Sequence, residues 1–275
     1  MLPPLRTAHL LPLVDAKLIE LLRSLTPREW SFRTLAAAWT VKEVAAHLLD
    51  TQQRLVSRLR GDVAPPPPAI GSDADLVAFI NRLNAAGVAR YVRLEPEALI
   101  AQLEDGSPLY AAHHQSLDPL AEAPHAVSWA GETRSANWFH TARELTERWH
   151  HQQQIRLAVG RPGIMTRELY HPVLDCFMRA LPFAYRDQTR ETGTVARFTV
   201  EGACGGSWDL SREALGWDLI PEPAGRVASE TRIPEEIAWR IFTKGIDRGA
   251  AAQAVRVSGD AALGGHVLGM IAIVG

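Results

Sequence analysis

Apolar side chains recur at helical spacing through most of the first 160 residues. The clearest series follows Thr40 and runs over residues 41–59, with Gly61 just beyond it. Thr40 and Glu43 stand three positions apart, as in a capping box that satisfies the free backbone N–H groups at the start of a helix. This pattern predicts a helix that begins at Thr40 and ends before Gly61.

The same spacing predicts further helices in this half of the chain. We expect long helices over residues 9–24, 73–93 and 136–159, and shorter helical pieces over residues 97–103 and 108–117. Gly160 and Pro162 are signals that end the last of them. Four principal helices with connections of variable length predict a helical bundle.

The pattern changes after residue 163. One more helix is expected over residues 167–185, followed by short segments rich in β-forming residues over 195–200, 206–210, 217–220 and 226–229. Helical signals return over residues 234–243 and 260–271. Antiparallel strands followed by helices favour a small α+β domain. We therefore divide the chain into a bundle over residues 1–163 and an α+β domain over residues 164–275.

The composition of the chain excludes several classes of protein. The 275 residues carry a formal net charge of −2, which predicts no basic surface for nucleic acid or for an anionic membrane. The chain contains no run of about 18 apolar residues, and prolines and charges interrupt its apolar start, unlike a signal peptide. Two cysteines, Cys176 and Cys204, are too few for a disulfide framework. We therefore expect a cytoplasmic protein.

The densest group of ionisable side chains lies in the helix expected over residues 136–159. His140, Glu144, Glu147 and His151 follow one another at offsets of 0, 4, 7 and 11, which places them on one stripe. Glu147 and His151, one turn apart, have the spacing to bind one ion, and His47 is the best candidate for a third ligand. Two histidines and a carboxylate with an open position are typical of catalytic zinc, and also of non-haem iron.

A purely structural interpretation competes with this metal site. Trp138, Ala142, Leu145 and Trp149 lie nearly opposite the stripe, so on a simple amphipathic helix the tryptophans would face the core and the stripe would face water. His47 lies at the edge of an apolar helix face, where a histidine is more often a core or boundary residue than a ligand.

The remaining candidates are weaker. His150 points about 100° away from His151 on a helix, which favours a supporting or surface role. His113 and His114 are expected at the surface. Cys204 stands between glycines, as in a turn that joins strands, and Cys176 is expected in the core.

Residues 39–48, W-T-V-K-E-V-A-A-H-L, resemble the signature W-[ST]-x-x-[DE]-x-x-x-H-L of the DinB-like superfamily. More narrowly, they resemble the N-terminal metal-binding domain of the mycothiol-dependent maleylpyruvate isomerases. Residues 151–155, H-Q-Q-Q-I, are similar to the H-x-x-Q-I ending of that superfamily, and the C-terminal D-A-A-L-G-G-H-V-L-G is similar to a sterol-carrier-like α+β domain often appended to it.

The resemblance implies a four-helix bundle that holds a divalent metal on the matching residues His47, Glu147 and His151. Zinc is the expected metal, with nickel or iron(II) as alternatives. It also implies a second cofactor, mycothiol or another small thiol, and a small-molecule substrate. We therefore expect a metal- and thiol-dependent isomerase or S-transferase acting on a small electrophilic or unsaturated acid. A homodimer is compatible with the sequence, which does not determine the oligomeric state.

Two other functions stay open: a hydrolase of the same fold that uses metal-activated water, and a non-catalytic module that binds a metal or an apolar ligand. The chain also departs from the isomerase pattern. That pattern has an acidic residue a few positions after the last ligand, where this chain has Gln152, Gln153 and Gln154. Arginines in the second half cannot be matched to a substrate-anchoring role. The metal-binding scaffold is therefore better supported than any one reaction.

Overall fold

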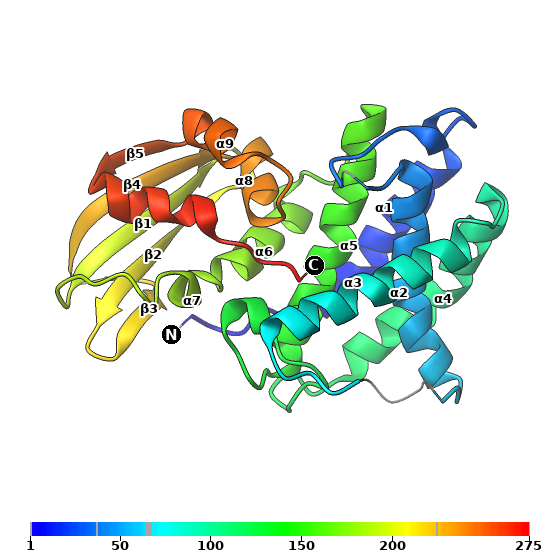
Figure 1. Ribbon diagram of the computed structural model, residues 1–275, viewed down its shortest axis with the longest axis horizontal. Helices are drawn as coiled ribbons and strands as arrows, with labels where there is room; N and C mark the ends of the chain where they lie inside the picture. The colour runs from blue at the N-terminus through cyan, green and yellow to red at the C-terminus, as the bar shows by residue number, and fades with distance from the viewer. Residues whose placement is uncertain (1, 37, 64–67, 224, 275) are drawn as a thin grey trace. The chain divides into compact units, whose positions relative to one another are not determined.

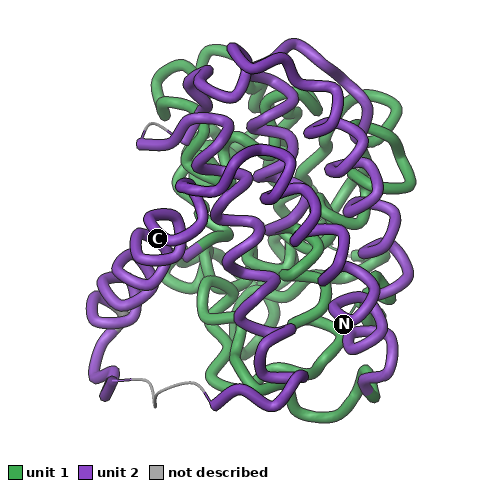
Figure 2. The backbone as a smooth tube through the Cα atoms, turned by 90° about the vertical axis from the view of Figure 1, so that its right-hand side faces the viewer, with its two compact units in different colours: residues 1–7, 118–146, 165–273 green, residues 8–117, 147–164, 274–275 purple. Residues whose placement is uncertain are grey.

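The computed structural model describes residues 2–36, 38–63, 68–223 and 225–274. Their contacts group the chain into two compact units (Figure 2). The helical unit comprises residues 8–117, 147–164 and 274–275, and the sheet unit comprises residues 1–7, 118–146 and 165–273. The boundary between the two units falls within one helix, α5 (Asn137–Val159). The division at residue 163 expected from the sequence stays a prediction.

The helical unit is a bundle of helices (Figure 1), and a cluster of buried hydrophobic side chains lies within it. Its other elements are η1 (Ala8–Leu10), α1 (Leu11–Arg23), η2 (Glu29–Ser31), α2 (Val41–Leu59), α3 (Asp73–Tyr91) and α4 (Pro96–Ser116). Helices α1, α2, α4 and the second part of α5 contribute the cluster's buried side chains, among them Leu18, Leu22, Val44, Leu48, Leu99, Leu103 and Ile155. Helix α3 packs against α2 and stays largely exposed.

Helix α4 is continuous, whereas the sequence predicts two short pieces. Pro108 lies inside it, where a proline removes one backbone hydrogen bond, and Gly106 is a second breaking signal. Burial of Leu99 and Tyr110 on one face outweighs these local preferences. Gly106 permits a close approach to α2, because a Cβ at this position would collide with the side-chain amide of Gln52. Helix α4, and not α3, therefore completes the bundle core.

The capping box predicted at the start of α2 is confirmed. The Thr40 hydroxyl accepts a hydrogen bond from the Glu43 backbone N–H at 3.4 Å, and the Glu43 carboxylate accepts one from the Thr40 N–H at 2.7 Å. Because the cap fixes the residue at which α2 begins, and helical spacing fixes which residues share a face, the same side chains face the bundle interior along the helix. Val44, His47 and Leu48 are all buried.

Two arginines of α5, Arg148 and Arg156, are buried in the helical unit and contact polar groups there. The Arg148 guanidinium lies 2.8 Å from the Asp15 carboxylate on α1, with both side chains 3% exposed, and stacks over the Tyr110 ring at 4.1 Å. Arg156 donates hydrogen bonds to the backbone carbonyls of Lys17 and Pro162, each at 2.9 Å. Because a buried charge without a partner costs several kcal/mol, these contacts hold α5 against α1.

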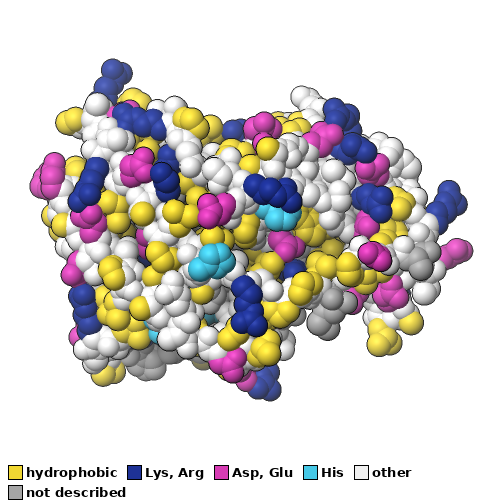
Figure 3. Space-filling model, turned by 180° about the vertical axis from the view of Figure 1, so that it is seen from behind, with side chains coloured by type: hydrophobic (Ala, Val, Ile, Leu, Met, Phe, Trp, Pro, Cys, Tyr) yellow, Lys and Arg dark blue, Asp and Glu magenta, His cyan; other side chains and the backbone are white. Residues whose placement is uncertain are grey.

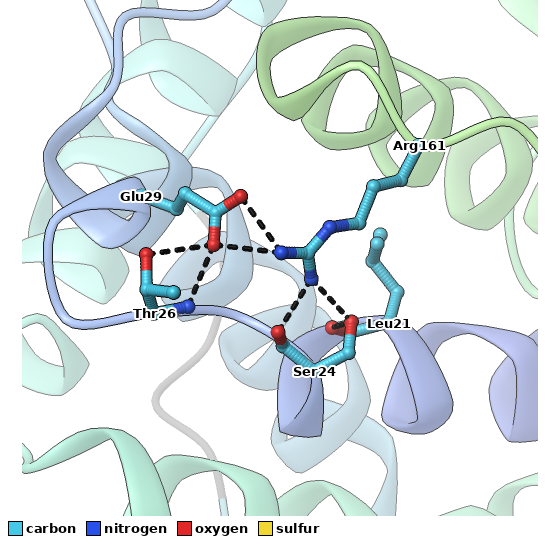
Figure 4. A network of polar contacts seen from close by, with 5 residues as sticks. All are labelled: Leu21, Ser24, Thr26, Glu29 and Arg161. Carbon is cyan, nitrogen blue, oxygen red and sulfur yellow. Dashed lines mark hydrogen bonds and ion pairs between the residues drawn. The ribbon is translucent and has the colours of Figure 1, made fainter.

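Arg161, just after α5, connects the end of this helix to the segment that follows α1 (Figure 4). Its guanidinium donates hydrogen bonds to both Glu29 carboxylate oxygens, at 2.8 and 2.9 Å, and to the backbone and side-chain oxygens of Ser24. Hydrogen bonds from Thr26, and then the neighbouring Arg161, lower the pKa of Glu29. One guanidinium nitrogen contacts both carboxylate oxygens and the other contacts Ser24, so these charge-assisted hydrogen bonds fix where α5 ends within the bundle.

The sheet unit contains a five-stranded sheet in the order β3-β2-β1-β4-β5 (Figure 1). The strands are β1 (Thr194–Glu201), β2 (Gly206–Glu213), β3 (Gly216–Ile220), β4 (Arg226–Pro234) and β5 (Arg256–Gly259). The helices are η3 (Ser128–Ala130), α6 (Arg167–Met178), α7 (Leu181–Ala184), α8 (Glu235–Phe242), α9 (Arg248–Ala254), α10 (Ala261–Gly265) and η4 (His266–Gly269), together with the first part of α5. Helices α8 and α10 contact the central strands β1 and β4.

This unit confirms the predicted α+β class but corrects several details. Strands β1 and β4 pair in parallel, whereas we expected antiparallel strands throughout. Strand β4 extends to Pro234, because Thr231 and Ile233 are buried and continue its alternation. Strand β5 and helix α9 are short and lack a strong apolar pattern, so the sequence does not reveal them. The helix expected over residues 167–185 is interrupted after α6, and the one over residues 260–271 is reduced to α10 and η4.

Of the helices in the described ranges, none combines the length and apolar character that a membrane span requires. On the face of the molecule seen in Figure 3, acidic and basic side chains are interspersed. This mixture agrees with the formal net charge of −2.

The capping box yields a stability prediction. Thr40→Ala removes the hydroxyl that caps α2 and should lower the free energy of unfolding by about 1 kcal/mol. Urea denaturation followed by circular dichroism measures this change. The matched control is Thr51→Ala in the same helix, whose hydroxyl only donates to the Leu48 carbonyl, and we expect less than half the loss. Equal losses in the two variants would contradict a capping role for Thr40.

Candidate metal centre

His47 from α2 and Glu147 and His151 from α5 converge inside the helical unit. One ligand atom from each side chain can be chosen so that all three lie within 4.8 Å of one another. The imidazole ring centroids of His47 and His151 are 4.6 Å apart with the rings 72° from coplanar, and Glu147 Oε2 lies 3.6 Å from His151 Nε2. Among the described residues, no other cluster of three histidine, cysteine or acidic side chains has this geometry.

The arrangement fits a divalent metal of the zinc type. Bonds of about 2.0–2.1 Å in a tetrahedral site place neighbouring ligand atoms about 3.4 Å apart. The 3.6 Å distance between Glu147 and His151 is close to this value, and a separation of up to 4.8 Å needs only small side-chain rotations. Two imidazoles and one carboxylate leave a fourth position for a small ligand, as in catalytic zinc sites.

Both histidines of the cluster are buried, and burial affects the protonation of His47. His47 is 4% and His151 8% exposed, whereas the Glu147 side chain remains 32% exposed, so the cluster is accessible to solvent beside the carboxylate. Burial, followed by the proximity of His151, lowers the pKa of His47 well below its ordinary value. His47 is therefore neutral at physiological pH, which is the form that binds metals.

The competing interpretation, in which the stripe faces water, is thus wrong for His151 and for His140, which are both buried. The Nδ1 atom of His47 is also buried and has no hydrogen-bond partner among the described residues. A buried imidazole without its full set of protein partners is unfavourable unless another group satisfies it. This observation favours a ligand role for His47 over a purely structural one.

Two further residues surround the imidazoles. The Trp39 ring centroid lies 4.8 Å from that of His47 and 6.1 Å from that of His151, so the indole packs against both histidines. Gln154, one turn after His151, places its Oε1 2.9 Å from the Nδ1 of that histidine. The sequence identified Trp39 and Gln154 only as motif positions. Their spacing from His47 and His151 was the signal that they belong to the site.

A family profile described as the mycothiol maleylpyruvate isomerase N-terminal domain matches residues 11–156, more than half of the chain. The chain belongs to this family. No curated protein matches it significantly. The resemblance inferred from the sequence is therefore confirmed.

Two solved structures have a similar fold. The crystal structure of a histidine-to-alanine mutant of the mycothiol-dependent maleylpyruvate isomerase aligns with a TM-score of 0.54 and 14% identity, covering 94% of this chain and 93% of that one. The crystal structure named for that isomerase itself aligns with a TM-score of 0.51 at the same identity and coverage. The alignment spans both the bundle and the α+β region, which confirms the fold class predicted for this family member.

The stripe predicted on α5 divides into two groups in this family member. Glu147 and His151 join the cluster with His47. His140 and Glu144 belong to the other unit, where the Arg143 guanidinium lies 2.7 Å from His140 Nδ1 and donates to Glu144 at 2.8 Å. A guanidinium between an imidazole and a carboxylate disfavours a cation at that position.

The structure also defines the positions of two other histidines, His150 and His114. His150 is buried with its ring centroid 4.0 Å from that of His151, beside the cluster and outside its three ligands. His114 is buried 4.8 Å from the Tyr110 ring, so the surface position expected for it is wrong. The cause is the continuous helix α4, which carries this residue into the interior.

Neither cysteine is suited to nucleophilic chemistry. Cys176 is fully buried in α6, as expected. Cys204 lies in the turn between β1 and β2, also as expected, and its thiol is buried against the Met165 carbonyl. Burial, followed by the nearby Glu235 carboxylate, raises the pKa of Cys204 to about 11.

The two thiols should therefore be unreactive in the folded protein. At pH 8 a thiol with that pKa is about 0.1% thiolate, and the thiolate is the reactive form. We expect a chromogenic disulfide reagent to modify neither cysteine in native protein within minutes, and both after denaturation. Cys176→Ser and Cys204→Ser identify which thiol reacts. Rapid modification of native protein that disappears in Cys204→Ser would contradict the burial and raised pKa of that residue.

Proposed function

We propose that this protein is a metal- and thiol-dependent isomerase or S-transferase acting on a small electrophilic or unsaturated acid. The observation that carries the proposal is the convergence of His47, Glu147 and His151 within 4.8 Å in a chain of this family. The names of the two similar structures, both mycothiol-dependent maleylpyruvate isomerases, support the choice of thiol and reaction class.

His47, Glu147 and His151 would hold the metal, with zinc preferred and nickel or iron(II) as alternatives. When bound, a divalent metal would lower the pKa of a thiol or water at its open position. The Trp39 ring packs against the two histidines, and Glu147 is the partly exposed member of the three, so a small ligand would approach beside Glu147. His47, which burial keeps neutral, provides a donor without further charge.

The nucleophilic sulfur would come from a small thiol such as mycothiol. The two cysteine thiols do not serve, because Cys176 and Cys204 are both buried. Addition of a thiol to an unsaturated acid, rotation about the former double bond and release of the same thiol give isomerisation without an external oxidant. A chain with only two cysteines is compatible with a reducing compartment, for which we propose the cytoplasm.

The metal site can be tested by elemental analysis of purified protein. We expect about one divalent metal per wild-type chain, and less than about a tenth of that in His47→Ala and in His151→Ala, because each variant loses one of three ligands. His9→Ala, which lies outside the cluster, is the control and should retain the metal. Circular dichroism verifies that the variants fold. Unchanged metal content in both ligand variants would disprove the site.

Thiol dependence can be tested separately with maleylpyruvate as substrate and mycothiol as cofactor. We expect isomerisation, followed by ultraviolet absorbance, to require mycothiol and to fall at least about a hundredfold after the metal is removed with a chelator. Zinc added back should restore it. Hydrolysis of esters or amides without thiol would favour the water-activating alternative. Binding of an apolar ligand that survives metal removal, without any turnover, would favour the non-catalytic module.

A further inference from the structure

The side chain of Gln154 is positioned to control the imidazole of His151. Both residues lie on α5, three positions apart and therefore on the same helix face. Gln154 is 4% exposed, and its Oε1 lies 2.9 Å from His151 Nδ1. A buried contact of this kind is protected from competition by water, so it constrains the ring.

The chemistry of the contact determines which nitrogen of His151 is available. A neutral imidazole has one N–H donor and one lone-pair acceptor, and an amide oxygen can only accept. A neutral ring that donates from Nδ1 to Gln154 Oε1 carries its proton on Nδ1 and its lone pair on Nε2. Nε2 is also the atom that lies 3.6 Å from Glu147 Oε2 within the ligand cluster.

His47 provides a contrast within the same cluster. Its Nδ1 has no hydrogen-bond partner among the described residues, and the ring packs against Trp39 and His151. One histidine is therefore positioned by packing and the other by a hydrogen bond. Removal of that hydrogen bond should affect His151 specifically.

We propose that Gln154 is a positioning residue that holds His151 as its Nδ1–H tautomer, with Nε2 directed at the metal, and that its neutral amide keeps the loaded site cationic. This inference rests on the proposed metal site. Two neutral imidazoles, one carboxylate and a divalent cation have a net charge of +1, so binding of a thiolate neutralises the site. A carboxylate at position 154 would accept the same hydrogen bond but would leave the loaded site neutral before the thiolate arrives.

The proposal predicts opposite effects for two substitutions. Gln154→Met keeps the length of the side chain but removes the acceptor, and should weaken zinc binding by about 10- to 100-fold. Gln154→Glu restores the acceptor and adds charge, so it should bind zinc at least as tightly as wild type. The same Gln154→Glu variant should bind mycothiol about tenfold more weakly when loaded with zinc, because the thiolate then meets a neutral site.

The primary measurement is zinc affinity by competition with a chromophoric chelator. Gln153→Met is the matched control: it is the same substitution in the same helix at 7% exposure, and the Gln153 side-chain oxygen makes no hydrogen bond among the described residues. We expect Gln153→Met to change zinc affinity less than about twofold. Equal losses in Gln153→Met and Gln154→Met, or no loss in Gln154→Met, would overturn the proposal.

The second measurement is independent of metal binding and of activity. Nitrogen-15 NMR of the histidine side chains in metal-free protein reports the tautomer of each ring. We expect His151 to be the Nδ1–H tautomer in wild type and in Gln154→Glu, and to shift toward Nε2–H in Gln154→Met. An Nε2–H tautomer in wild type would disprove the role of Gln154. Failure of wild type to bind zinc would disprove the proposed function while leaving this tautomer test decisive.

Discussion

The helical unit depends on how α5 buries its polar side chains. Arg148 meets Asp15, and Arg156 and Arg161 reach backbone carbonyls and Glu29. The contacts of Arg148 and Arg156 satisfy groups that would be costly to bury alone, and Arg161, which is partly exposed, adds an ion pair just after the helix. Together they place α5 against α1 and the segment that follows it. The edge of α5 that carries Glu147 and His151 then faces α2, where the ligand cluster forms.

Packing and hydrogen bonds position the three side chains of the cluster, and the Glu147 carboxylate remains accessible to solvent. Capping of α2 by Thr40 and packing by Trp39 position His47, and the pairs along α5 position His151 and Glu147. Only the carboxylate retains appreciable exposure. Such a site can hold a cation between helices whose positions are set by other interactions, which is how metal centres in bundles are generally built.

Prediction from the sequence worked best where the signals were local. The capping box at Thr40, the long helices α1, α2, α3 and α5, and the turn around Cys204 all follow from neighbouring residues. It was least successful where distant contacts outweighed local preference. Helix α4 continues through Gly106 and Pro108 because its buried face packs on α1 and α2, and β5 forms because β4 offers a free edge.

By itself, the sequence determined the family signature, the α plus α+β class and the three candidate ligands, because each depends on residue types at short, fixed spacings. Only the tertiary structure decided that the α5 stripe divides, with Glu147 and His151 facing His47 while His140 meets Arg143. It also decided that Gln154 contacts His151. Helical periodicity specifies which residues share a face. It does not specify what that face meets, because the partners come from helices about 100 residues away in the chain.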